Sequence, residues 1–206
     1  MSESILVINA GSSSVKFALF DQATNRPDIT LKGQVSGIGT APAIEAFTGD
    51  GDPVSCPQSI GGIVSHSDAF DTLLDWFGER GEQVVGAGHR VVHGGAGFTA
   101  PVRVDENIIK AFEALIHLAP HHQPHNILAI RALASRYPNL PQVACFDTAF
   151  HASQPPEAKE LGLPPEYNEK GLRRYGFHGL SYESVLTALP VVMGQAVPSR
   201  LVIAHL

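Results

Sequence analysis

The residues of this chain that could do chemistry fall in a few short clusters, and the first follows the opening apolar run. Residues 9–16 read Asn-Ala-Gly-Ser-Ser-Ser-Val-Lys, between two apolar segments (5–8 and 15–20) with the composition of buried strands. Such a turn can offer backbone N–H groups and hydroxyls to an anion, with an ammonium group at its rim. An ordinary hairpin whose serines face water has the same composition. The sequence lacks the Gly-Lys-Ser/Thr of the familiar phosphate loop, so a β-hairpin holding phosphates is the better hypothesis.

A second cluster, residues 88–95, reads Gly-His-Arg-Val-Val-His-Gly-Gly. Strand alternation places Arg90 and Val92 on one face, and His89 and His93 on the other. Arg90 could clamp a carboxylate or phosphate with its fork of donors, or it could pair with a structural carboxylate; both interpretations stay open. His89 and His93 are about 13 Å apart at about 3.3 Å per residue, so they do not share a metal ion.

A third cluster is rich in histidine and invites a zinc hypothesis. Prolines 120 and 124 interrupt it, so its spacing cannot be projected onto one helix face, and neither Cys nor a tight carboxylate pattern accompanies it. One histidine reaching a substrate is the favoured interpretation. The cluster consists of His117, His121, His122 and His125.

Two further clusters lie towards the end of the chain. Asp147 follows an apolar strand-like run, at the strand end where α/β sheets usually place ligands. It could hold Mg²⁺ or orient a substrate, or it could cap a helix starting at Thr148. Residues 173–179, Arg-Arg-Tyr-Gly-Phe-His-Gly, could form a phosphate-contacting loop or a packed turn with surface arginines.

Composition limits the classes of function. The 206 residues are 44% hydrophobic and 17% charged, which indicates a soluble globular protein. The formal net charge of −6 argues against non-specific nucleic-acid binding, and no apolar stretch approaches the ~20 residues that span a bilayer. The N-terminus shows no signal peptide, and Cys56 and Cys145 are expected to be free thiols in a reducing compartment. We therefore expect a cytoplasmic protein.

The apolar spacing predicts an antiparallel start followed by alternating strands and helices, which gives a mixed α/β sheet. Residues 65–68 fit a capping box, the helix after Asp105 is expected to end at Pro120, and residues 37–63 predict hairpins and turns. Residues 152–174, rich in Pro, Glu and Gly, predict a long connection or the start of a second unit. Strands are expected over 5–8, 15–20, 28–36, 83–92, 142–146 and 200–206, and helices after Ser65, Asp105 and Pro124 and over 181–189.

Taken together, these clusters resemble the acetate kinases. Residues 9–16, 88–95, 118–120, 145–151 and 173–179 occur in the order seen in that family. The resemblance implies an actin-like, ribonuclease H-like ATPase fold with two related α/β domains around a cleft. Residues 1–150 would form the first domain, and 151–206 the connection and the opening of the second. It also implies reversible Mg²⁺-dependent phosphoryl transfer between ATP and acetate, giving ADP and acetyl phosphate.

The resemblance further implies roles for individual residues. Asn9 would lie near the metal and the phosphates, with Ser12, Ser14 and Lys16 on the phosphate-side hairpin. Arg90 would bind the acyl carboxylate or the transferring phosphoryl group, His122 and His178 would stabilise its charge, and Asp147 would act through Mg²⁺ or by orienting acetate. Val92 and Phe177 would wall the pocket for the acyl methyl group, and His205 matches the histidine that precedes the family's Gly-Asn-Gly phosphate loop. The full-length protein would be a homodimer.

Four departures from the family bear on these expectations. His121 stands where an apolar residue usually lines the acyl pocket, Gln123 replaces a usual Asn, and Tyr182 replaces a common His. Acetate kinases are also about twice as long, so the 206-residue chain is expected to have little activity alone. A propionate or butyrate kinase of the same family, and a non-catalytic anion-binding remnant, stay open as alternatives.

Overall fold

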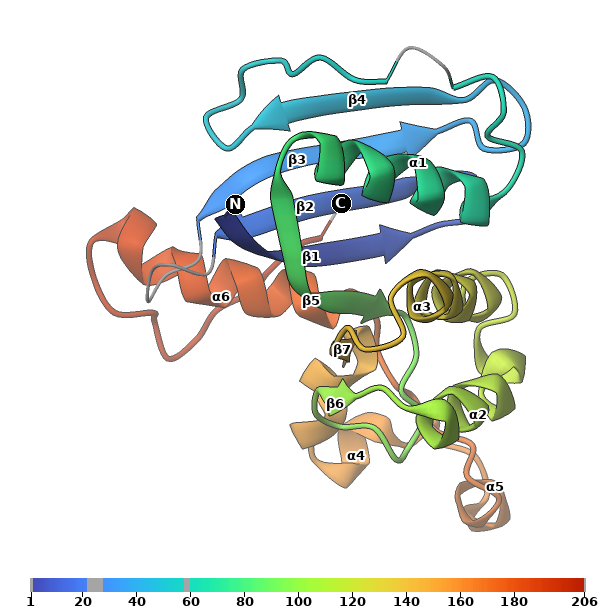
Figure 1. The fold of residues 1–206 in the computed structure, drawn as a ribbon. Helices are drawn as coiled ribbons and strands as arrows, with labels where there is room; N and C mark the ends of the chain where they lie inside the picture. The colour runs from blue at the N-terminus through green and yellow to red at the C-terminus, as the bar shows by residue number, and fades with distance from the viewer. Residues whose placement is uncertain (1, 22–27, 58–59, 206) are drawn as a thin grey trace.

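The computed structural model describes residues 2–21, 28–57 and 60–205. Their strands form one seven-stranded sheet in the order β4-β3-β2-β1-β5-β7-β6 (Figure 1). The expected mixed α/β fold is confirmed. The strands are β1 (Ser2–Ala10), β2 (Val15–Asp21), β3 (Ile29–Ser36), β4 (Ala43–Thr48), β5 (Glu82–Val91), β6 (Val102–Arg103) and β7 (Gln142–Phe146).

Strand direction brings three strand ends to one edge of the sheet. Strands β1 to β4 form an antiparallel meander, whereas β5 pairs parallel to β1 and β7 pairs parallel to β5. The carboxyl ends of β1, β5 and β7 therefore lie side by side. The chain leaves β1 there through the glycine-serine turn, leaves β5 through Val92, and leaves β7 through Asp147.

Helices α1 (His66–Glu79) and α3 (Gln123–Arg136) pack against each other and cover one face of the sheet (Figure 1). The expected capping box is confirmed, since the Ser65 hydroxyl accepts from the Asp68 N–H and the Asp68 carboxylate accepts from the Ser65 N–H. Alternate residues of β1 and β2, among them Leu6, Ile8 and Phe17, are buried beneath these helices. Because this core takes up one face of β1 and β5, the opposite face of these strands is left for polar side chains.

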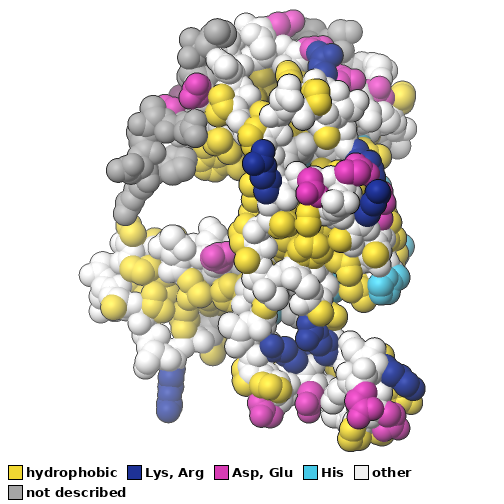
Figure 2. Space-filling view, turned by 60° about the horizontal axis from the view of Figure 1, so that its bottom comes forward, with side chains coloured by type: hydrophobic (Ala, Val, Ile, Leu, Met, Phe, Trp, Pro, Cys, Tyr) yellow, Lys and Arg dark blue, Asp and Glu magenta, His cyan; other side chains and the backbone are white. Residues whose placement is uncertain are grey.

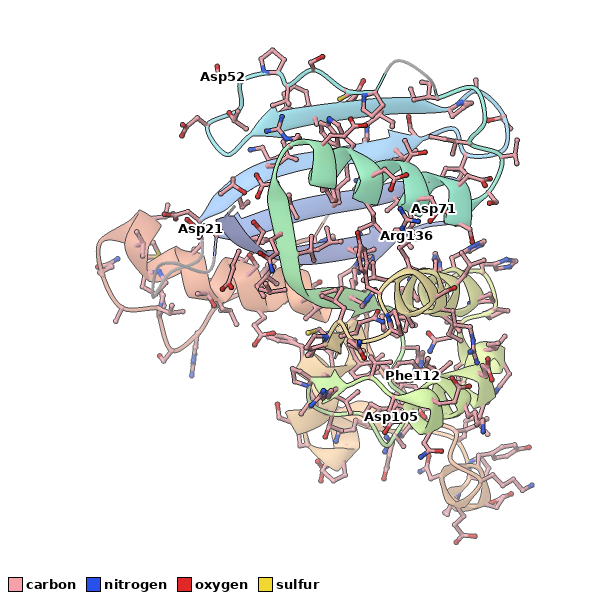
Figure 3. All side chains as sticks on the ribbon, viewed as in Figure 1. Asp21, Asp52, Asp71, Asp105, Phe112 and Arg136 are labelled. Carbon is pink, nitrogen blue, oxygen red and sulfur yellow. The ribbon has the colours of Figure 1, made fainter. Side chains whose placement is uncertain are left out.

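A second hydrophobic core lies where α2 and α3 pack against β5 and β7. Helix α2 (Glu106–Ala114) is capped by the Asp105 carboxylate, which accepts from the Ile108 N–H. Its Phe112 is fully buried against Phe98 and Phe146. Figure 3 labels Phe112 on this helix and Asp105 just before its start. The helix ends at Ala114 rather than continuing to Pro120, because the chain tightens there into the short helix η1 (Ile116–Leu118).

Three features after Gly95 differ from the sequence-based expectation. The two-residue strand β6 was not predicted, because it is too short to show alternation. The segment 152–174 contains the end of η2 (Asp147–Ser153) and two short helices, α4 (Pro156–Lys159) and α5 (Pro165–Glu169). Helix α6 (Gly179–Met193) is longer than the expected 181–189, and it packs against η2 and β7.

The expected strand over residues 200–206 is wrong for residues 200–205, which have neither helix nor strand structure. Residue 206 lies outside the described part of the chain. Val202 is 94% exposed, and no neighbouring strand pairs with this segment in the described sheet. A strand needs a partner for its backbone hydrogen bonds, and an apolar run alone does not supply one.

The surface carries mixed charge. On the face shown in Figure 2, Lys and Arg side chains lie among Asp and Glu side chains, and hydrophobic side chains occupy much of the middle. Among the residues that the structure describes, no helix is both long and apolar enough to cross a membrane.

Candidate active site

Arg90 is the centre of the polar cluster at the strand ends. It occupies the penultimate position of β5, on the face opposite to α1 and α3. Its Nη2 donates to Asp147 Oδ2 at 2.6 Å, and its Nε lies 3.2 and 3.3 Å from the two carboxylate oxygens. Its Nη1 donates to Asn9 Oδ1 at 3.0 Å. A guanidinium has five N–H donors, so the head group keeps N–H groups for a ligand.

Burial of this ion pair is uneven. The Asp147 side chain is 1% exposed and the Arg90 side chain 30% exposed. Arg90 therefore does pair with a carboxylate, and this pairing does not exclude ligand binding, because the Arg90 side chain is still partly exposed and lines a pocket. Asp147 does not cap η2, which has no side-chain cap hydrogen bond.

A pocket of about 410 Å³ opens over this pair. Its lining unites six of the predicted site residues from four separate segments of the chain: Arg90, Val92, His122, Asp147, Phe177 and His178. Leu118, Ala119, Pro120 and His121 complete the wall. The lining thus combines apolar side chains with a guanidinium, a carboxylate and histidines, which suits a small anion with an apolar end.

Val92 and Phe177 are two of the apolar side chains in this lining. Val92 is buried, whereas Phe177 is 47% exposed and therefore only partly covered by the described residues. His121 and His122 are exposed, and His122 stands immediately before the first residue of α3. His121 lines the pocket, as expected from its position in the motif.

The glycine-serine turn lies next to the pocket without lining it. The Gly11 N–H donates to the Ser14 carbonyl at 2.8 Å, which closes the turn between β1 and β2. Ser12 is exposed and Ser14 half-exposed. Lys16 is directly opposite Asn9 in the antiparallel pair, so both side chains project from the same face of the sheet. Because Asn9 also accepts a hydrogen bond from Arg90, it links this turn to the Arg90–Asp147 pair.

His178 and His205 lie at the start of α6. His178 has φ = 56°, in the left-handed region, and precedes the helix. Its ring stacks on that of His205 with centroids 4.5 Å apart, and His205 Nε2 lies 3.1 Å from the Ser181 hydroxyl. Tyr182 packs against Phe150 and lies 5.7 Å from the His205 ring. His205 does not line the pocket itself, but it contacts His178, which does.

Glycine at position 179 fits the path of the chain against Asp147. A Cβ at Gly179 would lie 1.9 Å from the Asp147 carbonyl oxygen and 2.5 Å from Phe150 Cβ. Only a residue without a side chain lets α6 approach η2 this closely. This contact sets the position of His178 relative to the Arg90–Asp147 pair.

Sequence reasoning missed two polar residues that hold the strand ends in place. The Asn126 amide donates to the Ala10 carbonyl at 3.0 Å and accepts from the Val92 N–H at 3.1 Å. His66 Nε2 lies 2.7 Å from the Gly11 carbonyl. His66 follows the helix-capping Ser65, which was the available signal, but its partner is 55 residues away. Gln123, one of the departures from the family, is buried and donates to the His93 carbonyl.

Burial lowers the pKa of three histidines. Desolvation lowers the pKa of His89 to about 4, despite a 2.7 Å contact between its Nε2 and Gln142 Oε1 that favours the charged form. Burial also lowers the pKa of His93, with a smaller effect from His117. For His125, burial lowers the pKa first, and repulsion from His66 and His122 lowers it further.

The described residues contain no group of three or more His, Cys, Asp or Glu side chains that could hold a metal ion. Zinc binding by the histidine cluster thus finds no support in this part of the chain. The Asn9 amide oxygen and the Asp147 carboxylate meet on Arg90. These oxygens already accept hydrogen bonds from the Arg90 guanidinium, so a Mg²⁺ ion beside them would take most of its ligands from waters and substrate phosphates.

The fold and the site together define a mixed α/β domain with a polar cluster and a pocket at the carboxyl ends of β1, β5 and β7. Comparison with solved structures finds the same architecture in several kinases, including a propionate kinase and an acetate kinase. A propionate kinase from Francisella tularensis superimposes with a TM-score of 0.82 at 35% identity, covering 95% of this chain and 50% of its own. The acetate kinase of Porphyromonas gingivalis gives 0.80 at 30% identity, covering 94% and 50%.

Sequence comparison gives the family. The acetokinase family profile matches residues 4–206, so the chain belongs to the acetokinase family. Acetate kinase from Rhodopseudomonas palustris is 46% identical over 100% of this chain and 53% of its own length. Acetate kinase from Nitrobacter hamburgensis is 43% identical over 99% and 51%. The chain spans about half the length of the curated relatives it matches.

Proposed function

We propose that this chain supplies the acyl and phosphoryl side of a kinase that transfers a phosphoryl group reversibly between ATP and a short carboxylate, with acetate as the first candidate. The observation that carries the proposal is the Arg90 head group. It is held by Asp147 and Asn9, and it lines a pocket that also carries apolar side chains. Family membership supports the same reaction.

The reaction requires positioning and positive charge more than covalent help from the protein. Acetate is already ionised at neutral pH, so no strong general base is needed. The main barrier is the approach of two anions, which the Arg90 guanidinium, Lys16 and histidines 122 and 178 would offset as charge spreads over the equatorial oxygens. Val92 and Phe177 would hold the methyl group, and this orients the carboxylate towards Arg90.

The phosphate side of the reaction would be held by the turn between β1 and β2. Ser12 and Ser14 would offer hydroxyl and N–H donors, and His205 would lie on the far side of His178. Asn9 and Asp147 would hold Mg²⁺, which supplies neutralisation of the nucleotide's phosphate charge when bound. Residues 1–150 would form one domain and 151–206 the opening of a second. We further propose that the longer protein works as a cytoplasmic homodimer.

A propionate kinase is the second candidate, because the propionate kinase from Francisella tularensis shares this fold at 35% identity. An apolar pocket distinguishes one methylene by only about 1–3 kcal/mol, so both acids are expected to react to some degree. His121 in the pocket wall adds a polar ring beside the acyl end. The ratio of kcat/KM for acetate, propionate and butyrate decides between the candidates.

The reaction is tested by incubating protein with ATP, Mg²⁺ and each acid, and trapping the acyl phosphate as its hydroxamate. The 206-residue chain is compared with a protein that joins it to the remaining half of the Rhodopseudomonas palustris relative. We expect little turnover from the chain alone and measurable turnover from the joined protein. Binding of acetyl phosphate to the chain alone, lost in Arg90→Ala, is measured in parallel by calorimetry. Acetyl phosphate binding that is unchanged in Arg90→Ala argues against the proposal.

A further inference from the structure

Two side chains from the helix layer hold consecutive carbonyl groups of the glycine-serine turn. His66, the first residue of α1, lies with Nε2 2.7 Å from the Gly11 carbonyl oxygen. Asn126, the fourth residue of α3, donates to the Ala10 carbonyl at 3.0 Å. His66 is 7% exposed and Asn126 2% exposed, so neither contact competes freely with water. A carbonyl oxygen can only accept, so His66 Nε2 carries the proton.

The hydrogen bond to Gly11 determines the direction of the next N–H group. The peptide between Gly11 and Ser12 is trans and planar, so its N–H points away from its carbonyl. The carbonyl points towards His66, beneath the turn, and the Ser12 N–H therefore points outwards. Ser12 is exposed, and its N–H has no hydrogen-bond partner within the described part of the chain. The Ser12 N–H can therefore donate to a ligand that binds over the turn.

The hydrogen bonds of Asn126 couple the turn to the pocket. While its Nδ2 donates to Ala10, its Oδ1 accepts from the Val92 N–H at 3.1 Å. One side chain thus fixes the carboxyl end of β1 relative to the carboxyl end of β5. The His66 ring also stacks on His125 of α3, with centroids 5.2 Å apart, which ties the starts of the two helices together. The turn is therefore held from below by both helices.

We propose that His66 and Asn126 are positioning residues for phosphoryl transfer: His66 aims the Ser12 N–H at a phosphate of the nucleotide, and Asn126 sets the distance between that phosphate and the acyl pocket. This inference rests on the proposed function. A carbonyl that loses its donor can rotate, and the turn then samples orientations in which the Ser12 N–H points elsewhere. Loss of one such hydrogen bond to a ligand lowers affinity about tenfold.

The test uses His66→Phe, which keeps the ring and its stacking on His125 but removes the donor, and His66→Gln, whose amide nitrogen can replace Nε2. In the joined protein described above, we expect His66→Phe to raise the KM for ATP about tenfold and to leave the KM for acetate within about twofold. His66→Gln should restore the KM for ATP to within about threefold of the unchanged protein. Asn126→Leu, which loses both of its bonds, should lower kcat as well. The matched control is His117→Phe, since the exposed His117 also contacts a carbonyl, that of Ala114, outside the pocket.

A second measurement separates this inference from the proposed function. Inorganic pyrophosphate is titrated into the isotopically labelled 206-residue chain, and the amide resonance of Ser12 is followed by NMR. We expect a saturable shift in the unchanged chain and in His66→Gln, and a shift at least tenfold weaker in affinity in His66→Phe. The inference is overturned if His66→Phe binds pyrophosphate with unchanged affinity and an unchanged Ser12 shift. If the Ser12 shift behaves as expected but no acyl phosphate forms, the inference holds for phosphate binding and the proposed reaction fails.

Discussion

Replacing Asp147 by Asn removes the charge that holds Arg90 while keeping the size of the side chain. The carboxylate accepts from both Nε and Nη2 of Arg90, and its side chain is 1% exposed. Removing one partner of a buried ion pair costs about 3–5 kcal/mol. The Arg90 side chain is 30% exposed and can recover some hydration, so the lower end applies. We expect Asp147→Asn to lower the unfolding free energy by about 3 kcal/mol.

For a chain of this size, that loss corresponds to a fall in Tm of roughly 6–12 °C, measurable by circular dichroism. Activity should fall further than stability suggests, because Arg90 would then be held only by Asn9. Misplacement of a positioning group by about 1 Å can cost about 100-fold in rate, so we expect kcat of the joined protein to fall at least that far. The control is Asp75→Asn. Its ion pair with Arg136 is exposed on both sides and contributes about 0–1 kcal/mol.

A double variant separates the cost of an unpaired charge from the cost of lost packing. Arg90→Met with Asp147→Leu removes both charges, and it should be less destabilised than Asp147→Leu alone, because no charge is left without a partner. The reasoning is refuted if Asp147→Asn melts within about 2 °C of the unchanged chain, or if the double variant is less stable than Asp147→Leu.

Three further predictions follow from individual contacts. Gly179→Ala should displace α6 from η2, because its Cβ would lie 1.9 Å from the Asp147 carbonyl oxygen; a Tm unchanged within 2 °C, with Gly97→Ala at an open position as control, contradicts this. Burial lowers the pKa of His89 to about 4, so between about pH 6.5 and pH 4 the unfolded chain binds a proton that the folded chain does not. The unfolding free energy should thus fall as the pH drops through that window, by up to about 3 kcal/mol in denaturant titrations, and His89→Gln should flatten the dependence. Val92→Ala should widen the pocket and raise kcat/KM for butyrate relative to acetate by about 10-fold or less; an unchanged ratio places the acyl chain elsewhere.

Local features of the fold could be predicted from the sequence. The capping box at Ser65 and Asp68 needs only residues three positions apart, and the turn after Ala10 is marked by its own Gly and Ser residues. The strand expected over residues 28–36 was found as Ile29–Ser36. The capping box and the turn depend on contacts between neighbours in the chain, so residue type and spacing are enough to predict them. The strand was recognised by its composition, although its hydrogen bonds come from pairing with β2 and β4.

The expected strand over residues 200–206 shows the limit of such reasoning. Its apolar composition is that of a strand, but the described residues of this segment pair with no neighbour. Pairing is a property of two segments, and composition describes only one. For the same reason the two-residue strand β6 was not predicted, since it exists through its pairing with β7.

The sequence by itself determined the chemistry available to this protein: a turn of Gly and Ser, one arginine near the end of a strand, one aspartate after another strand, and a histidine before a helix. Only the tertiary structure decided which of these act together. Arg90 meets Asp147 across 57 positions of the chain and Asn9 across 81, and Asn126 reaches Ala10 across 116. Such contacts form because the parallel pairing of β1, β5 and β7 brings three carboxyl ends to one edge. Arg90 meets its partners on one face there, and His66 and Asn126 reach the turn from the helices on the other face.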